Sequence, residues 1–263
     1  MKILTGVLPP THGSIFVQGN EITKYTAREA KETGISCAYQ DLSLCTNLTV
    51  YENFALLNMP HHLLTKPGWR TQKQKETKQL LERFFPGSNI NVMKPVNMLT
   101  LAERQIVEIC KTLMTDDLKI LVLDEPTSAL STDKARQLHH VVHELSEKGV
   151  AVVYISHKLE EIQIVSDRIV IMRNGSITGE CNPAEISAAE LIGLLGGTAK
   201  QKTQIQENHE ERDNIVEISN LSAKNLFNIN LVWIKGEILG RSGLAGSGQK
   251  ELRNLIFRSK KKI

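Results

Sequence analysis

Two adjacent carboxylates and one histidine are the residues of this chain whose spacing most clearly suggests chemistry. Asp124 and Glu125 follow the apolar run 120–123, and His157 follows a second apolar run over 150–155 by one residue. An aspartate at the end of a buried strand can hold Mg²⁺ directly or through water. A glutamate beside it can orient and deprotonate an attacking water, and the histidine can reach a phosphate and the same water. The pattern is what nucleotide hydrolysis in an α/β domain requires.

The elements that must position these residues follow a strand, helix, strand pattern from residue 119 onward. The helix is expected over about 132–147, because the apolar residues at 138, 141, 142 and 145 fall on one face, and Gly149 ends it. A crossover of this length implies parallel strands. Because ligands of open parallel sheets bind beyond the carboxyl ends of the strands, we expect Asp124, Glu125 and His157 to share one edge.

Other segments show weaker periodicity. Strands are expected at 13–19, 34–39 and 168–172, the last followed by an Asn174-Gly175 turn. Amphipathic helices are expected at 71–85, 101–114 and 159–165. Residues 197–213 are polar and charged without apolar periodicity, which indicates a linker, and strands are expected after it at 215–218, 229–234 and 237–240.

The overall composition narrows the class of protein. The 263 residues are 41% hydrophobic and carry a formal net charge of +3, which argues against a dedicated nucleic-acid binder. Cys37, Cys45, Cys110 and Cys181 are scattered, so we expect reduced thiols and no zinc site. No apolar run approaches the roughly 20 residues of a membrane span. We therefore expect a cytoplasmic chain that reaches a membrane only through a partner.

At this point the sequence resembles the ATP-binding cassette family. The resemblance rests on ILVLDEPTSAL over 120–130, YISH over 154–157 and AYQD over 38–41. It implies an α/β fold with a P-loop NTPase-like parallel sheet, an antiparallel β subdomain and a helical subdomain at about 41–118. It also implies ATP and Mg²⁺ as cofactors.

The resemblance gives roles to individual residues. Asp124 would be the metal-binding Walker B aspartate, Glu125 the catalytic glutamate and His157 the switch histidine. Gln40 would contact the metal, sense the nucleotide and face the membrane partner. Ser131 stands where the family's D-loop carries an aspartate.

The family's signature segment corresponds to residues 99–105, which open a helix. By resemblance, Thr100, Ala102 and Glu103 would meet the γ-phosphate held by a second cassette copy, since helix N-termini attract anions. A structural interpretation is equally open and compatible with it, because Thr100 and Glu103 have the spacing of a capping box.

The branch of the family that the chain resembles most imports monosaccharides of the ribose, galactose and allose type and carries two cassettes per chain. Gly243, Gly246 and Gly248 have the spacing of a phosphate-binding loop opening the second cassette. Gln249 stands where the loop's lysine belongs, and Lys250 stands where its metal-binding hydroxyl belongs. A shift of one residue turns a side chain by about 100° around a helix, so we expect the lysine charge to be misdirected.

The resemblance also gives a domain division. Residues 1–196 would be a first cassette without its N-terminal strands and phosphate loop, and 197–213 a linker. Residues 214–258 would start the second cassette, and 259–263 would be a tail. The fold is thus expected to be incomplete and the chain truncated at both ends. In an alternative arrangement, residues 214–257 fold back and 237–240 fill the vacant central place in the sheet.

Two functions therefore remain open from the sequence. One is the ATP-hydrolysing subunit of a sugar importer, peripheral on the inner face of the cell membrane, with permease subunits and a periplasmic sugar-binding protein as partners. The alternative is a catalytically inactive remnant or interaction fragment of such a subunit, which the missing loop lysine and hydroxyl favour. The sequence does not identify the sugar.

Overall fold

The structure is a computed structural model of the chain. It describes residues 1–17, 19–21, 26–58, 67–115, 117–194, 214–223, 226–236, 239–240 and 248–258. Two compact units divide the chain, Met1–Ala199 and Lys200–Ile263, here called the first and the second unit.

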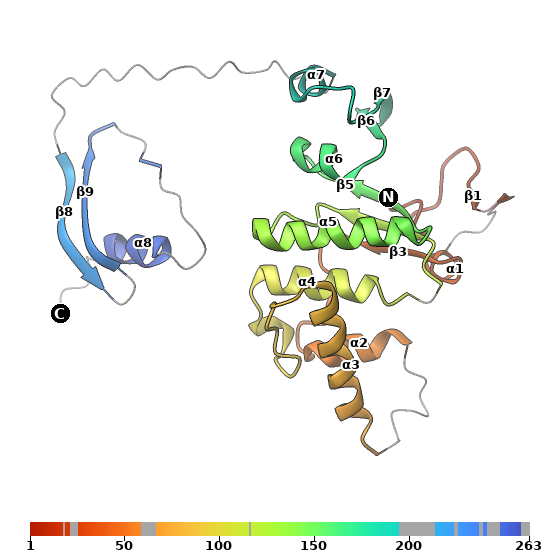
Figure 1. Cartoon of the computed structure of the whole chain (residues 1–263), viewed down its shortest axis with the longest axis horizontal. Helices are drawn as coiled ribbons and strands as arrows, with labels where there is room; N and C mark the ends of the chain where they lie inside the picture. Colours follow the sequence, from red (N-terminus) through yellow and green to blue (C-terminus); the bar gives the residue numbers. More distant parts are fainter. Residues whose placement is uncertain are drawn as a thin grey trace. The chain divides into compact units, whose positions relative to one another are not determined.

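A three-stranded parallel sheet lies at the centre of the first unit (Figure 1). Its strands, in spatial order, are β3 (Ile35–Ala38), β4 (Ile120–Asp124) and β5 (Ala151–Ile155). Ile120 pairs with Ile35 on one side and with Ala151 on the other, so the carboxyl ends of all three strands lie at the same edge. The parallel pairing confirms what the crossover between β4 and β5 predicted.

Two helices bury the apolar side chains of this sheet. Helix α5 (Thr132–Glu147) forms the crossover, and α4 (Leu101–Thr112) contacts β3. Leu121 and Leu123 of β4 share one buried cluster with Leu138 of α5. Because full burial of a leucine contributes about 1.5–3 kcal/mol, this cluster holds the strand ends in place.

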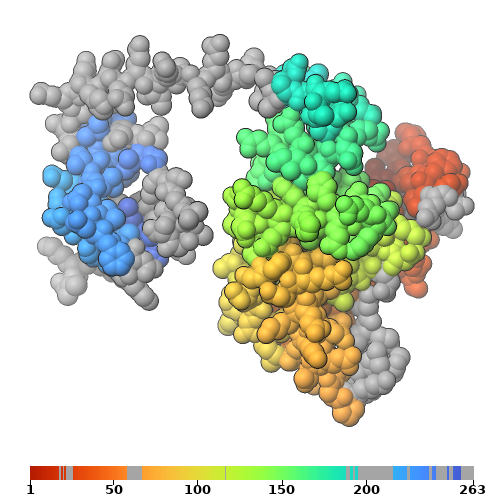
Figure 2. Space-filling model, viewed as in Figure 1, coloured from red at the N-terminus to blue at the C-terminus, as the bar shows by residue number. Residues whose placement is uncertain are grey.

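A group of helices forms one end of the first unit (Figure 2). Helices α2 (Val50–Asn58), α3 (Trp69–Phe84) and α4 contact one another, with Phe54 and Leu81 buried among them. The sequence predicted α3 and α4 but not α2 as a separate helix.

Smaller elements complete the first unit. Strand β6 (Ile169–Arg173) turns into β7 (Ser176–Cys181) through Asn174 and Gly175, both with positive φ (50° and 81°), as a two-residue hairpin of type I′ requires. These elements are β1 (Phe16–Val17), β2 (Asn20–Glu21), α1 (Ala27–Glu32), a 3₁₀ turn (Val96–Met98), α6 (Leu159–Val165), β6 (Ile169–Arg173), β7 (Ser176–Cys181) and α7 (Ala188–Leu194). None of the described helices is both long and apolar enough to cross a membrane.

The second unit contains an antiparallel hairpin and a helix. Its elements are β8 (Asn214–Ala223), β9 (Leu226–Ile234) and α8 (Gln249–Arg258). The predicted linker 197–213 lies outside the described residues, and of the predicted strand 237–240 only Leu239 and Gly240 are described, neither as strand. The fold-back alternative concerns 237–240, of which only two residues are described, so it stays an expectation.

Candidate functional site

The candidate site lies where β4 and β5 end. Asp124 is the last residue of β4 and pairs with Ile155, the last residue of β5. The N–H of Glu125 donates to the Ile155 carbonyl at 2.9 Å, which continues the pairing by one residue. Glu125 has a φ of 49°, a left-handed conformation that is uncommon for a residue other than glycine. Conformations of this kind cluster at functional sites, where the surrounding structure maintains them.

Glu125 and His157 are in direct contact. One carboxylate oxygen, Oε1, lies 2.8 Å from His157 Nδ1 and accepts a hydrogen bond from the His157 backbone N–H at 3.0 Å. The Glu125 side chain is 15% exposed, whereas that of His157 is 76% exposed. A buried carboxylate therefore fixes one side of the imidazole ring and leaves the rest of the ring open to solvent. The contact agrees with the prediction from the sequence that Glu125 and His157 lie at the same edge of the sheet.

The other oxygen of Glu125, Oε2, is buried and accepts no hydrogen bond from the residues that the structure describes. Leaving a buried charged acceptor unpaired costs about 1–3 kcal/mol or more, so this oxygen destabilises the site in the present arrangement.

The carboxylates suit Mg²⁺ only together with other ligands. Within the described ranges, no three or more His, Cys, Asp and Glu side chains gather in a way that could hold a metal. Mg²⁺ is usually held by one or two carboxylates together with water and substrate phosphates. Asp124, half-buried at the end of β4, fits that pattern.

The end of β3 brings Gln40 to the same edge of the sheet. Ala38, the last residue of β3, pairs with Leu123, the residue before Asp124. Gln40 follows two residues later and is exposed. The register thus aligns the segment carrying Gln40 with the segment carrying Asp124 and Glu125.

Just beyond Glu125 and His157 along the chain lie the members of a polar cluster that the sequence did not predict. It joins Thr127, Lys158 and Glu161 through hydrogen bonds. Burial raises the pKa of Glu161, but the hydrogen bonds from Thr127 and Lys158 outweigh it and hold the pKa below its usual value of 4.5. The three-residue spacing of Lys158, the N-cap of α6, and Glu161, in its first turn, is the sequence signal that could have predicted their contact.

The start of α4 forms the predicted capping box. The N–H of Thr100 donates to Glu103 Oε2 at 2.7 Å, and the N–H of Glu103 donates to Thr100 Oγ1 at 3.2 Å. The structural interpretation of Thr100 and Glu103 is thereby confirmed. By helix geometry, the N–H groups of Leu101 and Ala102 have no acceptor within the helix.

Ser131 also has a structural role. It is the N-cap of α5, and its hydroxyl accepts a hydrogen bond from the Lys134 N–H at 3.4 Å.

The glycine-rich segment of the second unit is only partly described. Gly243 and Gly246 lie outside the described residues, whereas Gly248 is described and has a φ of 95°. Gln249 and Lys250 open helix α8, and only their backbone is described.

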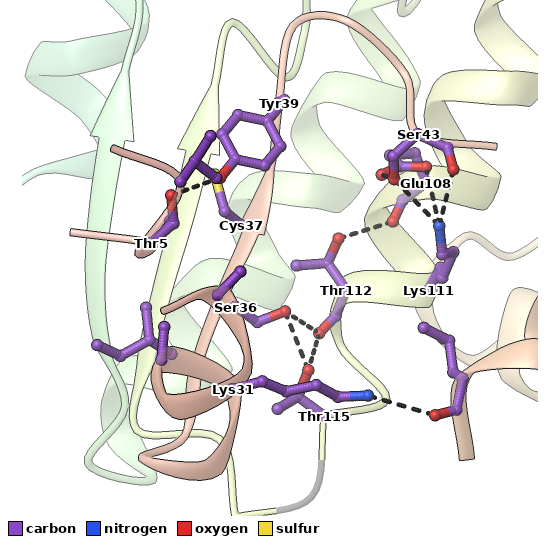
Figure 3. A pocket seen from close by; sticks show the side chains of 15 residues that line it. Thr5, Lys31, Ser36, Cys37, Tyr39, Ser43, Glu108, Lys111, Thr112 and Thr115 are labelled. Atoms are coloured by element: carbon purple, nitrogen blue, oxygen red, sulfur yellow. Dashed lines mark hydrogen bonds and ion pairs between the residues drawn. The ribbon is translucent and has the colours of Figure 1, made fainter. Parts of the chain in front are cut away.

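A pocket of about 270 Å³, lined by both polar and apolar side chains, lies beside β3 (Figure 3). Glu108 of α4 is 2% exposed, and its Oε1 accepts a hydrogen bond from Ser43 Oγ at 2.5 Å. Its Oε2 lies 3.7 Å from Lys111 Nζ and accepts no hydrogen bond among the described residues. Tyr39, directly before Gln40, lines the same pocket.

Comparison with known proteins gives concordant matches. The family model described as "ABC transporter" matches residues 1–128. The ribose import ATP-binding protein RbsA of Clostridium perfringens is 36% identical over 263 residues, covering 100% of this chain and 52% of that protein. The xylose import ATP-binding protein XylG of Moorella thermoacetica is 35% identical, covering 98% of this chain and 52% of that protein. The chain thus spans about half the length of the curated relatives it matches.

Solved structures match at the level of the fold. A dimeric post-hydrolysis state of an ATP-binding cassette bound to ADP and Pi has a TM-score of 0.58 at 19% identity, covering 69% of this chain and 78% of that chain. A nucleotide-free ATP-binding cassette from an ABC transporter has a TM-score of 0.56 at 23% identity, covering 74% and 78%.

Proposed function

This chain belongs to the ATP-binding cassette family, and we propose that it is the ATP-binding and ATP-hydrolysing subunit of a monosaccharide importer. The observation that carries the proposal is the contact between Glu125 and His157 at the ends of two adjacent parallel strands. The ribose and xylose relatives support a pentose as the transported sugar.

Glu125 is the proposed general base. Its Oε1 contacts His157, and its Oε2 is buried without a hydrogen bond from the described residues, so the carboxylate keeps unused acceptor capacity for the proton of the attacking water. The water oxygen then bonds to the γ-phosphorus, its proton goes to Glu125, and ADP leaves with the electron pair of the broken P–O bond. The ring of His157, whose side chain is 76% exposed, would contact the γ-phosphate.

Asp124 and Gln40 are the proposed protein ligands of Mg²⁺. When bound, this ion neutralises charge on the phosphates of ATP. The residues suit the role because the register places both at the carboxyl edge of the sheet, and because oxygen is the donor that Mg²⁺ prefers.

Two further segments are proposed to contact nucleotide. The N-terminus of α4, with Thr100, Ala102 and Glu103, would face the phosphate held by a second cassette copy, since the N–H groups and the helix dipole attract anions. Because Glu103 caps its own helix, its charge is partly engaged there. In the second unit, the Gly243–Lys250 segment is proposed to bind phosphate more weakly than a loop that carries the usual lysine and hydroxyl.

The proposed partners are membrane permease subunits and a periplasmic sugar-binding protein, with this subunit on the inner face of the membrane. The pocket beside Tyr39 and Gln40 is the proposed contact surface for the permease.

Purified chain tests the enzymatic part of this proposal. Binding of a fluorescent ATP analogue and Mg²⁺-dependent phosphate release are measured for the unaltered chain, for Glu125→Gln and for the control Glu160→Gln, which alters an exposed glutamate of α6. Glu125→Gln should keep binding and lose about 10²–10⁴-fold in turnover, the usual contribution of a general base.

The control variant should match the unaltered chain in both measurements. If the unaltered chain binds no nucleotide, the proposal fails and the inactive interaction fragment becomes the better account.

A further inference from the structure

Three side chains that closely follow Glu125 and His157 along the chain form what we call the clamp: Thr127, Lys158 and Glu161. Lys158 Nζ donates to the Thr127 carbonyl at 3.3 Å, to Thr127 Oγ1 at 3.2 Å and to Glu161 Oε1 at 3.0 Å. Thr127 Oγ1 donates to Glu161 Oε2 at 2.5 Å. Each member therefore contacts the other two.

The clamp connects the two segments that carry the catalytic pair. Thr127 follows Glu125 by two residues on the connection after β4. Lys158 directly follows His157 on the connection after β5, and Glu161 lies in the first turn of α6. Apart from the Glu125–His157 contact itself, the clamp is a second link between these connections.

Thr127 is 1% exposed and the side chain of Glu161 is 14% exposed, whereas that of Lys158 is 40% exposed. Solvent therefore screens the Thr127–Glu161 contact less than an ordinary surface ion pair, and it partly screens the contacts of Lys158. Hydrogen bonds to charged groups are roughly twice as strong as neutral ones, whereas exposed ion pairs contribute about 0–1 kcal/mol. Tyr154 of β5 also donates to Glu161 Oε2 at 3.3 Å, which anchors the clamp to the sheet.

We propose that the clamp positions Glu125 against His157, so that Thr127, Lys158 and Glu161 are positioning residues for the reaction. This inference rests on the proposed hydrolytic function. The left-handed backbone at Glu125 is an uncommon conformation, and the clamp closes on the chain two residues beyond it. Displacement of a reacting group by about 1 Å can cost about 10²-fold in rate, so loosening this link should affect turnover more than nucleotide affinity.

Thr127→Val tests the proposal because it keeps the shape of the side chain and removes the hydroxyl. We expect its kcat to fall by about 10- to 100-fold while KM for ATP stays close to that of the unaltered chain. Thr127→Ser keeps the hydroxyl and should restore most of kcat. Lys158→Met should resemble Thr127→Val, whereas the control Lys148→Met, at an exposed lysine, should not change kcat.

A second measurement does not depend on turnover. Nitrogen-15 NMR reports which ring nitrogen of His157 carries the proton, and contact with Glu125 favours Nδ1. In Thr127→Val and Lys158→Met the signal should shift toward protonation at Nε2, which a merely structural role elsewhere would not cause.

The outcomes separate this proposal from the proposed function. Unchanged kcat and an unchanged His157 signal in both variants would overturn the clamp. An unaltered chain without turnover, combined with a shifted His157 signal in the variants, would refute the proposed function and leave the clamp intact. If Thr127→Val does not fold, as judged by circular dichroism, kcat and the His157 signal of Lys158→Met are compared with those of the unaltered chain instead.

Discussion

Replacing Gly34 by alanine should weaken the pairing of β3 with β4 and thereby test how the sheet edge is aligned. Gly34 directly precedes β3 with a φ of +84°, and its carbonyl accepts hydrogen bonds from the N–H groups of Lys119 (2.8 Å) and Ile120 (3.1 Å). A Cβ at Gly34 would lie 2.3 Å from the carbonyl oxygen of Asp117. The backbone must move to relieve such a contact. Because Gly34 makes the first hydrogen bonds between β3 and β4, this movement would also disturb the strand pairing that brings Gln40 to the edge of the sheet.

Gly149 provides a matched control. It has a φ of +85°, but a Cβ there would meet nothing within 4 Å. Both substitutions carry the left-handed penalty of about 1–2 kcal/mol, reduced by about 0.4–1 kcal/mol through the less flexible unfolded chain. Only Gly34→Ala adds an overpacking cost of about 1–3 kcal/mol. We therefore expect losses of about 1 kcal/mol for Gly149→Ala and about 2–4 kcal/mol for Gly34→Ala.

Urea denaturation measures both values. Trp69 of α3 reports on the first unit, and a Trp233→Phe background removes the tryptophan signal of β9. The free energy of unfolding follows from linear extrapolation. If the two alanine variants differ by less than about 0.5 kcal/mol, the close approach of Gly34 to Asp117 does not constrain the strand and the reasoning is refuted.

Other expectations concern single side chains. Thr100→Ala should lower the free energy of unfolding by about 1 kcal/mol through loss of the α4 cap, whereas Thr100→Ser should change it little, as measured by urea denaturation. Burial raises the pKa of Cys37 to about 11, and because the thiolate is the nucleophile, iodoacetamide at about pH 8 should alkylate exposed Cys45 first, as peptide mass spectrometry would show; equal rates would contradict this. Glu161 has a folded pKa below its usual 4.5, so its stabilisation is complete above that pH and disappears as the pH falls through the folded pKa. Glu161→Gln should therefore reduce the drop of Tm between about pH 5 and pH 3, and an unchanged drop would count against the Glu161 contacts.

The elements around Glu125 and His157 were predictable because their patterns are strong. The apolar runs before Asp124 and before His157 predicted β4 and β5, and the apolar stripe at helical spacing predicted α5 with its observed bounds. The helices that were not predicted share a sequence signal. Helices α1, α2 and α7 each follow a capping box that starts at Thr26, Thr49 or Ser187.

Parts of the site could not be predicted from the sequence for physical reasons. The left-handed backbone of Glu125 depends on the hydrogen bond from its N–H to the Ile155 carbonyl, which exists only once β5 is paired. The clamp depends on how closely two connections 31 positions apart approach in space, and residue spacing does not supply that distance. The contact of Glu125 with His157 was predictable because parallel pairing alone brings their strands together.

The pairing of β4 with β5 and the pairing of β4 with β3 each close a loop of the chain, and these two loops differ greatly in length. Ile120 pairs with Ala151, 31 positions later, and with Ile35, 85 positions earlier. The loop-closure entropy of the longer connection exceeds that of the shorter by about 0.9 kcal/mol, from three-halves RT times the logarithm of the length ratio. Folding should then proceed in order, with β4, α5 and β5 forming a nucleus and β3 docking afterwards. On this pathway Glu125 and His157 meet early, and Gln40 reaches the edge of the sheet only when the late strand is in place.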